Sequence, residues 1–438
     1  MKVLLTDNYS SYNGGDAAIL DGMLFALRSA LPGAEFTVTS SHPDVATAVH
    51  GVPAVLWTPR RLPGRAAVVG WFTRSLAWTT LMRHMDGVRP LDERDSSDAA
   101  ARDLARTRLA RTLVSADEHA LLSAYNDSDL VIGVGGAYLR SGYRLTNLRL
   151  WQLHLAKAMG KPVMLYAASV GPFTGRRWWP RHVLDGLDAI TLRDRPSLYE
   201  LHRLGVVRPR IELAADAALA LPVPPAIAAP EPRPHLGVSV LHWHKFARGT
   251  FEGYRDAVAR ALDLLLDDWA RRVTFMSTTV APAGTSHDAS GTSRDDVAAA
   301  HDVMSRMAHA DRASVWETPL SVADLRARIG GFDLWIGNRM HSCIFATSSG
   351  VPTVAIGYEP KVAGYFQLLG LAEWVLDIET VAGPELARLA TGAWHARDTL
   401  TATMAAHLPE LRAQSLTSAQ VACELAGARS PTGIAPEP

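Results

Sequence analysis

Cysteine is nearly absent from this sequence, because only Cys343 and Cys423 occur in 438 residues. Two thiols cannot build a disulfide framework or a cysteine-rich metal site, and so few are typical of a reducing compartment. Neither sign of charge is in excess, since 44 Lys and Arg residues balance 44 Asp and Glu residues. Without a basic field to attract phosphates, nucleic acid is excluded as an expected partner.

Long apolar runs are also missing. No stretch reaches the ~18 uninterrupted apolar residues of a membrane-spanning helix, and the nearest approach, residues 66–82, is interrupted by Arg74. This segment is interpreted as a buried or half-buried helix of an insertion, or alternatively as a membrane-surface helix that meets a lipid-linked molecule. The N-terminal run Met1-Lys-Val-Leu-Leu is too short for a signal peptide and predicts a strand. We therefore expect a cytoplasmic protein, with peripheral contact at the inner face of the membrane as the alternative.

Strand-like and helix-like patterns alternate along the chain. Short apolar runs predict strands, and a period of about 3.6 residues, for example over 17–31 and 145–159, predicts helices between them. This alternation is typical of a parallel α/β sheet. The predicted strands are residues 2–5, 35–39, 130–134, 162–167 and 189–192 in the first half, and 236–240, 272–276, 334–336, 352–356 and 373–376 in the second.

A proline-rich segment separates the two halves. Residues 221–235 contain six prolines, which cannot continue a helix or occupy a central strand. A chain of 438 residues also suits two domains of about 200 residues each. The predicted parts are an N-terminal Rossmann-like domain at 1–220 with a helical insertion at about 60–125, a linker at 221–235, a C-terminal Rossmann-like domain at 236–426 and an unstructured tail at 427–438.

Three side chains that can carry positive charge follow two neighbouring strands of the second half. Arg339 and His341 come after the predicted strand at 334–336, and Lys361 comes after the next parallel strand at 352–356. In open parallel sheets, ligands bind beyond the carboxyl ends of the strands. The sequence therefore predicts a site at this edge that can hold an anion and move a proton.

The same segment carries a longer motif. It contains Arg339-x-His341, then Gly350-x-Pro352, then Tyr358-x-x-Lys361, and it is similar to the C-terminal signature of the polysaccharide pyruvyl transferase family. Four further blocks resemble the family in the expected order, so that the resemblance covers most of residues 1–370. These blocks are Asn13-Gly-Gly-Asp16-Ala-Ala-Ile-Leu, Gly133-Val-Gly-Gly-Ala-Tyr-Leu, Ser169-Val-Gly-Pro-Phe and Ile190-Thr-Leu-Arg193-Asp194.

The resemblance implies a fold, a reaction and its substrates. The implied fold is α/β, with two Rossmann-like parallel-sheet domains facing a cleft in the arrangement called GT-B. The implied reaction moves the enolpyruvyl unit of phosphoenolpyruvate onto hydroxyls of a sugar, oligosaccharide or lipid-linked glycan. It forms a pyruvate ketal and releases phosphate, with no cofactor and no metal. Because fold does not fix function, two alternatives stay open: a GT-B glycosyltransferase that uses a nucleotide sugar, and a non-catalytic homologue that binds glycans.

Phosphoenolpyruvate carries a carboxylate and a phosphate, so its site needs several cations or backbone amides close together. For each cationic side chain the alternative is an ordinary ion pair or a solvated position, and Asp194 offers Arg193 a local partner. The donor contacts that the resemblance implies are Arg193, Arg339, Met340, Ser342 and Lys361.

His341 and Asp16 are the predicted catalytic residues. His341 is expected to act as the general acid, because imidazole titrates nearest neutral pH, and the alternative is a helix cap or a core histidine. The resemblance makes Asp16 a candidate base for the acceptor hydroxyl, although aspartate at a helix start is most often an N-cap. Both roles are compatible. The sequence departs from the family at Ala17, where an acidic residue is usual.

Glycines and two histidines complete the predicted site. Glycine lets a backbone approach a ligand closely, and a helix N-terminus favours an anion. The two histidines stand two residues apart with no evident third ligand, so acceptor or phosphate contact, or an irregular turn, is expected in place of a metal. Cys343 is interpreted as buried packing, because no base is placed beside it. The predicted acceptor or backbone anion contacts are Asn13, Gly14, Gly15, Gly135, Gly136, His242 and His244.

Overall fold

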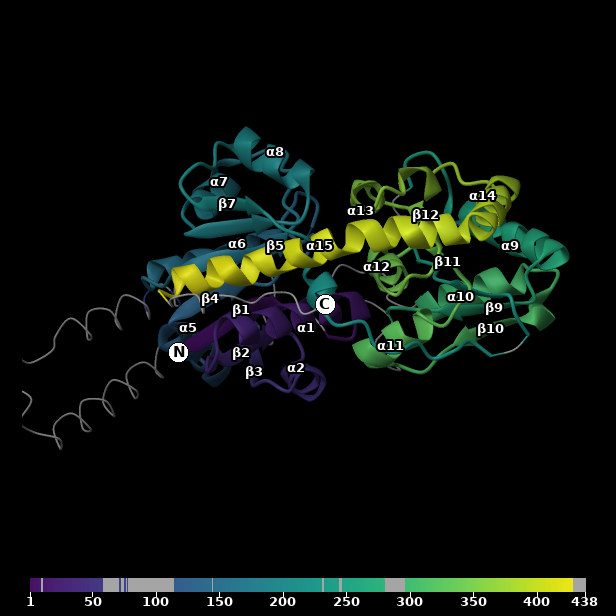
Figure 1. The fold of residues 1–438 in the computed structure, drawn as a ribbon. Helices are drawn as coiled ribbons and strands as arrows, with labels where there is room; N and C mark the ends of the chain where they lie inside the picture. Colours follow the sequence, from purple (N-terminus) through teal and green to yellow (C-terminus); the bar gives the residue numbers. More distant parts are fainter. Residues whose placement is uncertain are drawn as a thin grey trace, which may run out of the picture. The chain divides into compact units, whose positions relative to one another are not determined.

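Figure 1 shows the fold of the chain as a computed structural model. The structure describes residues 1–8, 11–57, 71, 75, 77, 114–143, 145–230, 232–243, 246–279 and 296–427. The predicted apolar segment 66–82, the predicted tail and His244 lie outside these ranges, apart from residues 71, 75, 77 and 427. Within the described ranges, no helix combines the length and the apolar character that a bilayer crossing requires.

Unit 1 is built on a seven-stranded parallel sheet in the order β3-β2-β1-β4-β5-β6-β7. The chain runs from β1 to one edge of the sheet and then returns beside β1 to build the other edge, which makes a topological switch point between β1 and β4. The strands are β1 (Lys2–Asn8), β2 (Glu35–Ser40), β3 (Ala54–Leu56), β4 (Leu130–Gly133), β5 (Val163–Ala168), β6 (Ala189–Leu192) and β7 (Arg210–Leu213). The helices are α1 (Gly14–Ala30), α2 (Pro43–His50), α5 (Ala116–Asp127), α6 (Thr146–Ala158), α7 (Trp178–Asp185) and α8 (Arg195–Leu204).

Unit 2 contains a six-stranded parallel sheet in the order β10-β9-β8-β11-β12-β13. Its switch point lies between β8 and β11. The strands are β8 (His235–Val238), β9 (Arg272–Met276), β10 (Ala313–Trp316), β11 (Leu334–Gly337), β12 (Thr353–Gly357) and β13 (Val375–Asp377). The helices are α9 (Phe251–Asp268), α10 (Asp296–Ser305), α11 (Val322–Ile329), α12 (Met340–Ser348), α13 (Pro360–Leu368), α14 (Gly383–His395) and α15 (Arg397–Leu425).

Two helices are divided between the units. Unit 1 comprises Met1–Ser11, Met23–Asp216 and Leu416–Pro438, and unit 2 comprises Tyr12–Gly22 and Ala217–Ser415. The start of α1 therefore belongs to unit 2, and the last part of α15, the long yellow helix in Figure 1, belongs to unit 1. As a result, the glycine-rich block that begins at Asn13 packs with the unit that holds Arg339 and His341.

The two parallel sheets confirm the predicted fold class. The predicted central strands match those of the structure to within a few residues, because they are buried on both faces and appear in the sequence as continuous apolar runs. The three strands that the sequence did not predict, β3, β7 and β10, all lie at sheet edges. Their residues are half-buried or exposed, so they carry no such run.

The proline-rich segment is anchored to unit 2 along α11. Residues 222–230 form neither helix nor strand. The backbone N–H of Ile227 donates to the carbonyl oxygen of Ala327 at 2.8 Å, and that of Ala229 donates to Gly331 at 3.2 Å. The Arg326 guanidinium donates to the carbonyl oxygen of Pro222 at 2.7 Å. These hydrogen bonds fix the course of the segment, although its prolines cannot join a sheet.

Helix α12 is a rigid base for the predicted site. All its residues except His341 are buried, and it packs against β11, β12 and α11. A helix that is apolar on every side belongs in a core, which explains why the stretch from Cys343 to Ala346 carries no charge. Burial raises the pKa of the Cys343 thiol to about 12, consistent with a packing role.

Candidate active site

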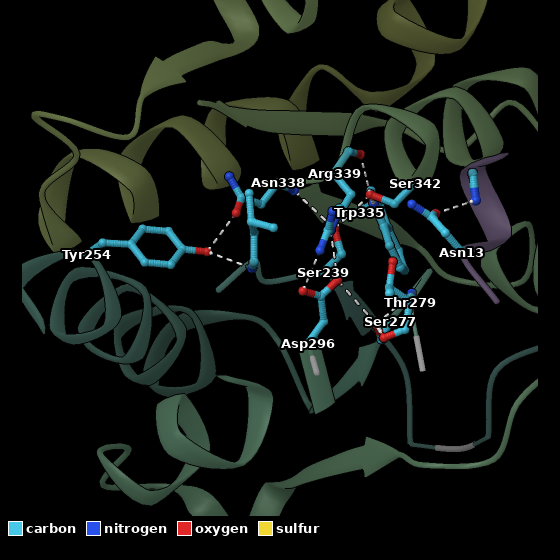
Figure 2. A network of polar contacts seen from close by, with 12 residues as sticks. Asn13, Ser239, Tyr254, Ser277, Thr279, Asp296, Trp335, Asn338, Arg339 and Ser342 are labelled. Carbon is cyan, nitrogen blue, oxygen red and sulfur yellow. Dashed lines mark hydrogen bonds and ion pairs between the residues drawn. The ribbon is translucent and has the colours of Figure 1, made fainter. Parts of the chain in front are cut away.

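Polar side chains meet at the switch point of the unit 2 sheet, beyond the carboxyl ends of β8 and β11 (Figure 2). The Ser239 hydroxyl, after β8, lies 2.7 Å from the Ser342 hydroxyl and accepts from the Asn338 backbone N–H at 3.0 Å. The Asn338 side chain donates to the carbonyl oxygen of Ile356 in β12 and accepts from the Tyr254 hydroxyl at 3.0 Å. These bonds fix the loop that presents Arg339.

Arg339 forms a two-pronged ion pair with Asp296, the first residue of α10. Its Nε and Nη2 each lie 2.8 Å from a carboxylate oxygen of Asp296 (Figure 2). The Asp296 side chain is 1% exposed, whereas that of Arg339 is 21% exposed. Burial works to lower the pKa of Arg339, but the Asp296 carboxylate outweighs it and raises that pKa above its ordinary value. The guanidinium is thus permanently charged and fixed in plane, with one edge held by the protein.

His341 lies against the glycine-rich block. A Cβ atom added to Gly15 would stand 2.8 Å from Cγ of His341 and nearer still to Nδ1, so the imidazole occupies the space that a side chain at position 15 would need. His341 is half-buried in the first turn of α12, where its ring also packs near Phe345. Position 15 therefore requires glycine because the His341 ring approaches its backbone closely.

The start of α1 is held on the end of β9. The Gly14 N–H donates to the carbonyl oxygen of Thr278 at 2.7 Å, and Asn13 forms an isolated antiparallel bridge with Thr279. The Asn13 side chain accepts from the Gly15 N–H at 2.9 Å, so Asn13 caps the helix (Figure 2). The expectation that Asp16 is the N-cap is wrong, because α1 already begins at Gly14.

Asp16 therefore occupies the first turn of α1, where its side chain is half-buried. The Asp16 carboxylate contributes to the raised pKa of Arg339, after the larger effects of Asp296 and Tyr358. The structure thus brings Asp16, Arg339 and His341 into one neighbourhood of unit 2. The roles assigned to them from sequence stay predictions.

Met340 and Ser342 are both buried within α12. The Ser342 hydroxyl donates to the carbonyl oxygen of Arg339 at 2.7 Å and meets the Ser239 hydroxyl, so in this structure it secures the start of the helix. Met340 lies directly between Arg339 and His341 in the chain and is 6% exposed. Their predicted contacts with a donor stay predictions.

Lys361 lies in the first turn of α13. Its Nζ pairs with a Glu359 carboxylate oxygen at 2.7 Å and stands 5.1 Å from the centre of the Tyr358 ring. Tyr358 in turn packs edge-on against Trp243 with ring centres 5.0 Å apart, and it acts electrostatically on Arg339. The Tyr358 ring thus lies near the Lys361 ammonium and also acts electrostatically on Arg339.

His242 is half-buried, with its ring centre 4.4 Å from that of Phe251. His244 is outside the described residues. The predicted acceptor or phosphate contact of the two histidines stays a prediction. Among the described residues, no group of three or more His, Cys, Asp and Glu side chains is arranged to hold a metal ion.

In unit 1, Arg193 follows β6 and forms a buried ion pair with Asp216 at 2.5 Å. Its Nε also donates to the Ser169 hydroxyl at 2.9 Å. Burial opposes the positive charge, but Asp216 raises the pKa of Arg193 above its ordinary value. Asp194, the alternative partner that the sequence offered, caps α8 by accepting from the Ser197 N–H at 2.9 Å, and it adds to the raised pKa of Arg193 after Asp216.

Gly135 and Gly136 follow β4 at the switch point of the unit 1 sheet. A Cβ at Gly135 would lie 2.6 Å from the carbonyl oxygen of Tyr166, and Gly136 has a φ of +142° beside the Tyr138 ring. Both positions therefore need glycine for close packing within the unit. Contact of these glycines with a ligand stays a prediction.

A buried charged group at the same edge was missed from the sequence. Asp7, at the end of β1, has a left-handed backbone with φ 73° and accepts from Trp57 Nε1 at 3.4 Å. Burial raises the pKa of Asp7 to about 6, against the opposing charge of Arg149. Arg149, 1% exposed, stacks on the Tyr138 ring. A strained, buried carboxyl at a strand end is typical of a functional edge, but no periodicity marks it in the sequence.

One family model covers most of the chain. A model of the polysaccharide pyruvyl transferase family matches residues 13–360. The chain is 23% identical to the amylovoran biosynthesis protein AmsJ of Erwinia amylovora over 406 residues. The alignment covers 87% of this chain and 89% of AmsJ. The matched range includes Asn13, Asp16, Arg193, Arg339 and His341, and it ends one residue before Lys361.

Solved structures share the fold at low sequence identity. A glycosyltransferase from Rickettsia africae has a TM-score of 0.55 at 8% identity, covering 98% of this chain and 99% of its own. The Anabaena protein HepE, solved with UDP and glucose, has a TM-score of 0.54 at 14% identity and covers 97% and 98%. The UDP-GlcNAc 2-epimerase from Neisseria meningitidis has a TM-score of 0.52 at 8% identity and covers 97% and 99%. Together they place the two parallel-sheet units in the GT-B-like group of folds.

Proposed function

The chain belongs to the polysaccharide pyruvyl transferase family, and we propose that it moves the enolpyruvyl unit of phosphoenolpyruvate onto two hydroxyls of a glycan acceptor. The products are a cyclic pyruvate ketal and inorganic phosphate. The observation that supports this most strongly is the meeting of Arg339, His341 and the block that starts at Asn13 in one place within unit 2. The acceptor is a sugar, an oligosaccharide or a lipid-linked glycan.

Anion binding is the first requirement of this reaction. Asp296 holds Nε and Nη2 of Arg339, which leaves the other edge of the guanidinium for a carboxylate or phosphate of the donor. The N-terminal turns of α1 and α12 add the positive ends of two helix dipoles. Lys361, supported by Tyr358, supplies further positive charge in our proposal. Fixed donors of this kind stabilise charge without reorganising during the reaction.

Proton transfer is the second requirement. His341 delivers a proton to the methylene carbon of phosphoenolpyruvate, and C2 gains oxocarbenium character that a sugar hydroxyl attacks. Asp16 takes the proton of that hydroxyl. The C2–O bond to phosphate then breaks, and the electron pair leaves with the phosphate. The second hydroxyl closes the ring at C2 and gives its proton to His341, which regains its acid form, while the proton on Asp16 leaves with the phosphate. The net change is one ketal formed and one phosphate released.

The proposal is tested by incubating the protein with phosphoenolpyruvate and a panel of sugar acceptors. We expect acceptor-dependent phosphate release and a product heavier than its acceptor by one pyruvate less one water. Phosphoenolpyruvate alone should raise the melting temperature by mass action. Stabilisation by a nucleotide sugar, with sugar transfer and no effect of phosphoenolpyruvate, would contradict the proposal and identify a glycosyltransferase.

Metal removal is expected to leave this activity intact. Arg339 and Lys361 supply the positive charge that a divalent cation would otherwise bring to the phosphate. Phosphate release after exhaustive treatment with EDTA should therefore equal that of the untreated protein. Loss of activity that one divalent metal restores would direct attention to His242 and the carboxylates near it.

Gly15→Ala should lower turnover by roughly 10-fold to 100-fold, because the new methyl group would displace the imidazole of His341. In an ordinary helix the same change is stabilising, since glycine loses more backbone freedom than alanine. Gly392→Ala in α14 is the matched control, because its Cβ would meet no atom closer than 3.6 Å. Turnover near wild type in both variants would show that the ring position is unimportant.

A further inference from the structure

A cavity of about 520 Å³ opens within unit 1, and none of its lining residues is among the groups assigned above. Its walls are the loop between β4 and α6, the loop between β5 and α7, and the first residues of those two helices, so it lies at the carboxyl edge of the unit 1 sheet. Ser169, which accepts from Arg193, stands at the start of the second loop. The lining residues are Arg140, Ser141, Gly142, Tyr143, Thr146, Asn147, Phe173, Thr174, Arg176, Trp178, Trp179 and Pro180.

The two loops are tied to each other. The Ser141 N–H donates to the carbonyl oxygen of Pro172 at 3.0 Å, and the Ser141 hydroxyl accepts from the Thr174 N–H at 2.8 Å. Leu139 and Val170 pair as a parallel bridge. Loops without such ties would lose conformational entropy when a ligand bound, whereas these are already fixed. The cavity is therefore preorganised.

One wall of the cavity presents an exposed indole. Trp178 is 65% exposed, which is unusual for the largest side chain. It packs edge-on against Trp179, with ring centres 5.7 Å apart, and Trp179 rests on His154 and His182. Burial, and to a smaller extent the neighbouring His182, lowers the pKa of His154. A rigid, exposed indole offers an apolar face with a polar edge, which suits the C–H face of a pyranose ring.

The charged side chains among the described lining residues of the cavity are two arginines. Arg140 and Arg176 line it, and none of its described lining residues is acidic. Guanidinium groups bind carboxylates and phosphates in preference to neutral hydroxyls, because both partners carry charge and the fork can donate twice. Hydroxyl and amide groups of Thr146 and Asn147 complete a lining suited to an oligosaccharide.

We propose that this cavity binds an acidic sugar residue of the acceptor glycan, with the ring on Trp178 and its carboxylate or phosphate at Arg140 and Arg176. The inference rests on the proposed function, because it names the class of acceptor for that reaction. It makes the protein selective for a glycan that is already anionic. A reaction that introduces a uronic acid or a sugar phosphate must therefore precede this one.

The test measures binding of three related probes by calorimetry: a trisaccharide of galacturonic acid, its neutral galactose counterpart, and galactose 1-phosphate. At least one acidic probe should bind about tenfold or more tightly than the neutral trisaccharide, and which one does so distinguishes carboxylate from phosphate. Trp178→Ala should weaken the preferred probe about tenfold, and Arg176→Gln should remove the preference for the acidic probe. Equal binding of all three probes would overturn the inference.

Matched variants exclude general damage. Tyr199→Ala removes an exposed ring on α8, 72% exposed, that does not line the cavity. Arg177→Gln changes the residue next to Arg176. Arg177 does not line the cavity, and its charge helps to lower the pKa of Glu200. Neither should alter probe binding, and all four variants should keep the stabilisation by phosphoenolpyruvate. If phosphoenolpyruvate did not stabilise the wild type but the probes still bound, only the proposed function would be contradicted. If Trp178→Ala and Arg176→Gln bound the probes as tightly as the wild type, only this inference would be contradicted.

Discussion

His341→Gln is expected to lower turnover by ~10² to 10⁴, the usual range for loss of a general acid. Glutamine is similar in size and can still donate a hydrogen bond, but it has no proton to transfer to carbon. The ring it replaces stands on a buried helix and against Gly15, so the rest of the site should keep its geometry. Steady-state phosphate release and the melting-temperature shift with phosphoenolpyruvate measure turnover and donor binding separately.

Asp16→Asn is the informative companion to this variant. Because Asn13, not Asp16, caps α1, the substitution should leave the helix start and donor binding unchanged and slow only the transfer to the acceptor hydroxyl. Wild-type turnover in Asp16→Asn would leave Asp16 with an electrostatic role beside Arg339. Retained turnover in His341→Gln would show that His341 only packs against the glycine-rich block, and the acid would have to be sought elsewhere.

The sequence predicted the sheets well where burial is complete. Strands such as β4 and β5 were placed to within a residue of their true limits, because parallel strands covered on both faces appear as nearly unbroken apolar runs. The edge strands β7 and β10 were missed because their residues are half-buried or exposed, so they form no buried apolar run. The start of α1 was placed too late, since periodicity detects the first buried residue and not the cap that precedes it.

Within the site, sequence indicated residue types but not partners. The motifs named Arg339, His341 and the block from Asn13, yet no spacing rule could show that Gly15 touches the His341 ring, because the two come from opposite ends of the chain. Asp296 was missed for a similar reason. It is a single carboxylate at the start of an ordinary helix, and only the tertiary fold places it opposite Arg339. Such pairings depend on how β9, β11 and their following helices are assembled.

Asp296→Ala is expected to lower the free energy of unfolding by about 3 to 5 kcal/mol, the usual cost of leaving a largely buried charge without its counter-ion. The carboxylate is 1% exposed and meets Arg339 with two contacts of 2.8 Å, so no water can easily replace it. The freed guanidinium would also lose its fixed plane, and stabilisation by phosphoenolpyruvate should fall with it. Urea denaturation and the melting-temperature shift with the donor measure the two effects.

Replacing both partners separates the two roles of the pair. Arg339→Met with Asp296→Leu removes both charges at similar volume, and such exchanges of buried ion pairs are often neutral or stabilising. The double variant should therefore regain most of the stability lost in Asp296→Ala but should show no stabilisation by phosphoenolpyruvate and no turnover. If the double variant still responded to phosphoenolpyruvate, the donor could not depend on Arg339. If Asp296→Ala alone kept both full stability and the donor response, Asp296 would not be what holds the guanidinium in place.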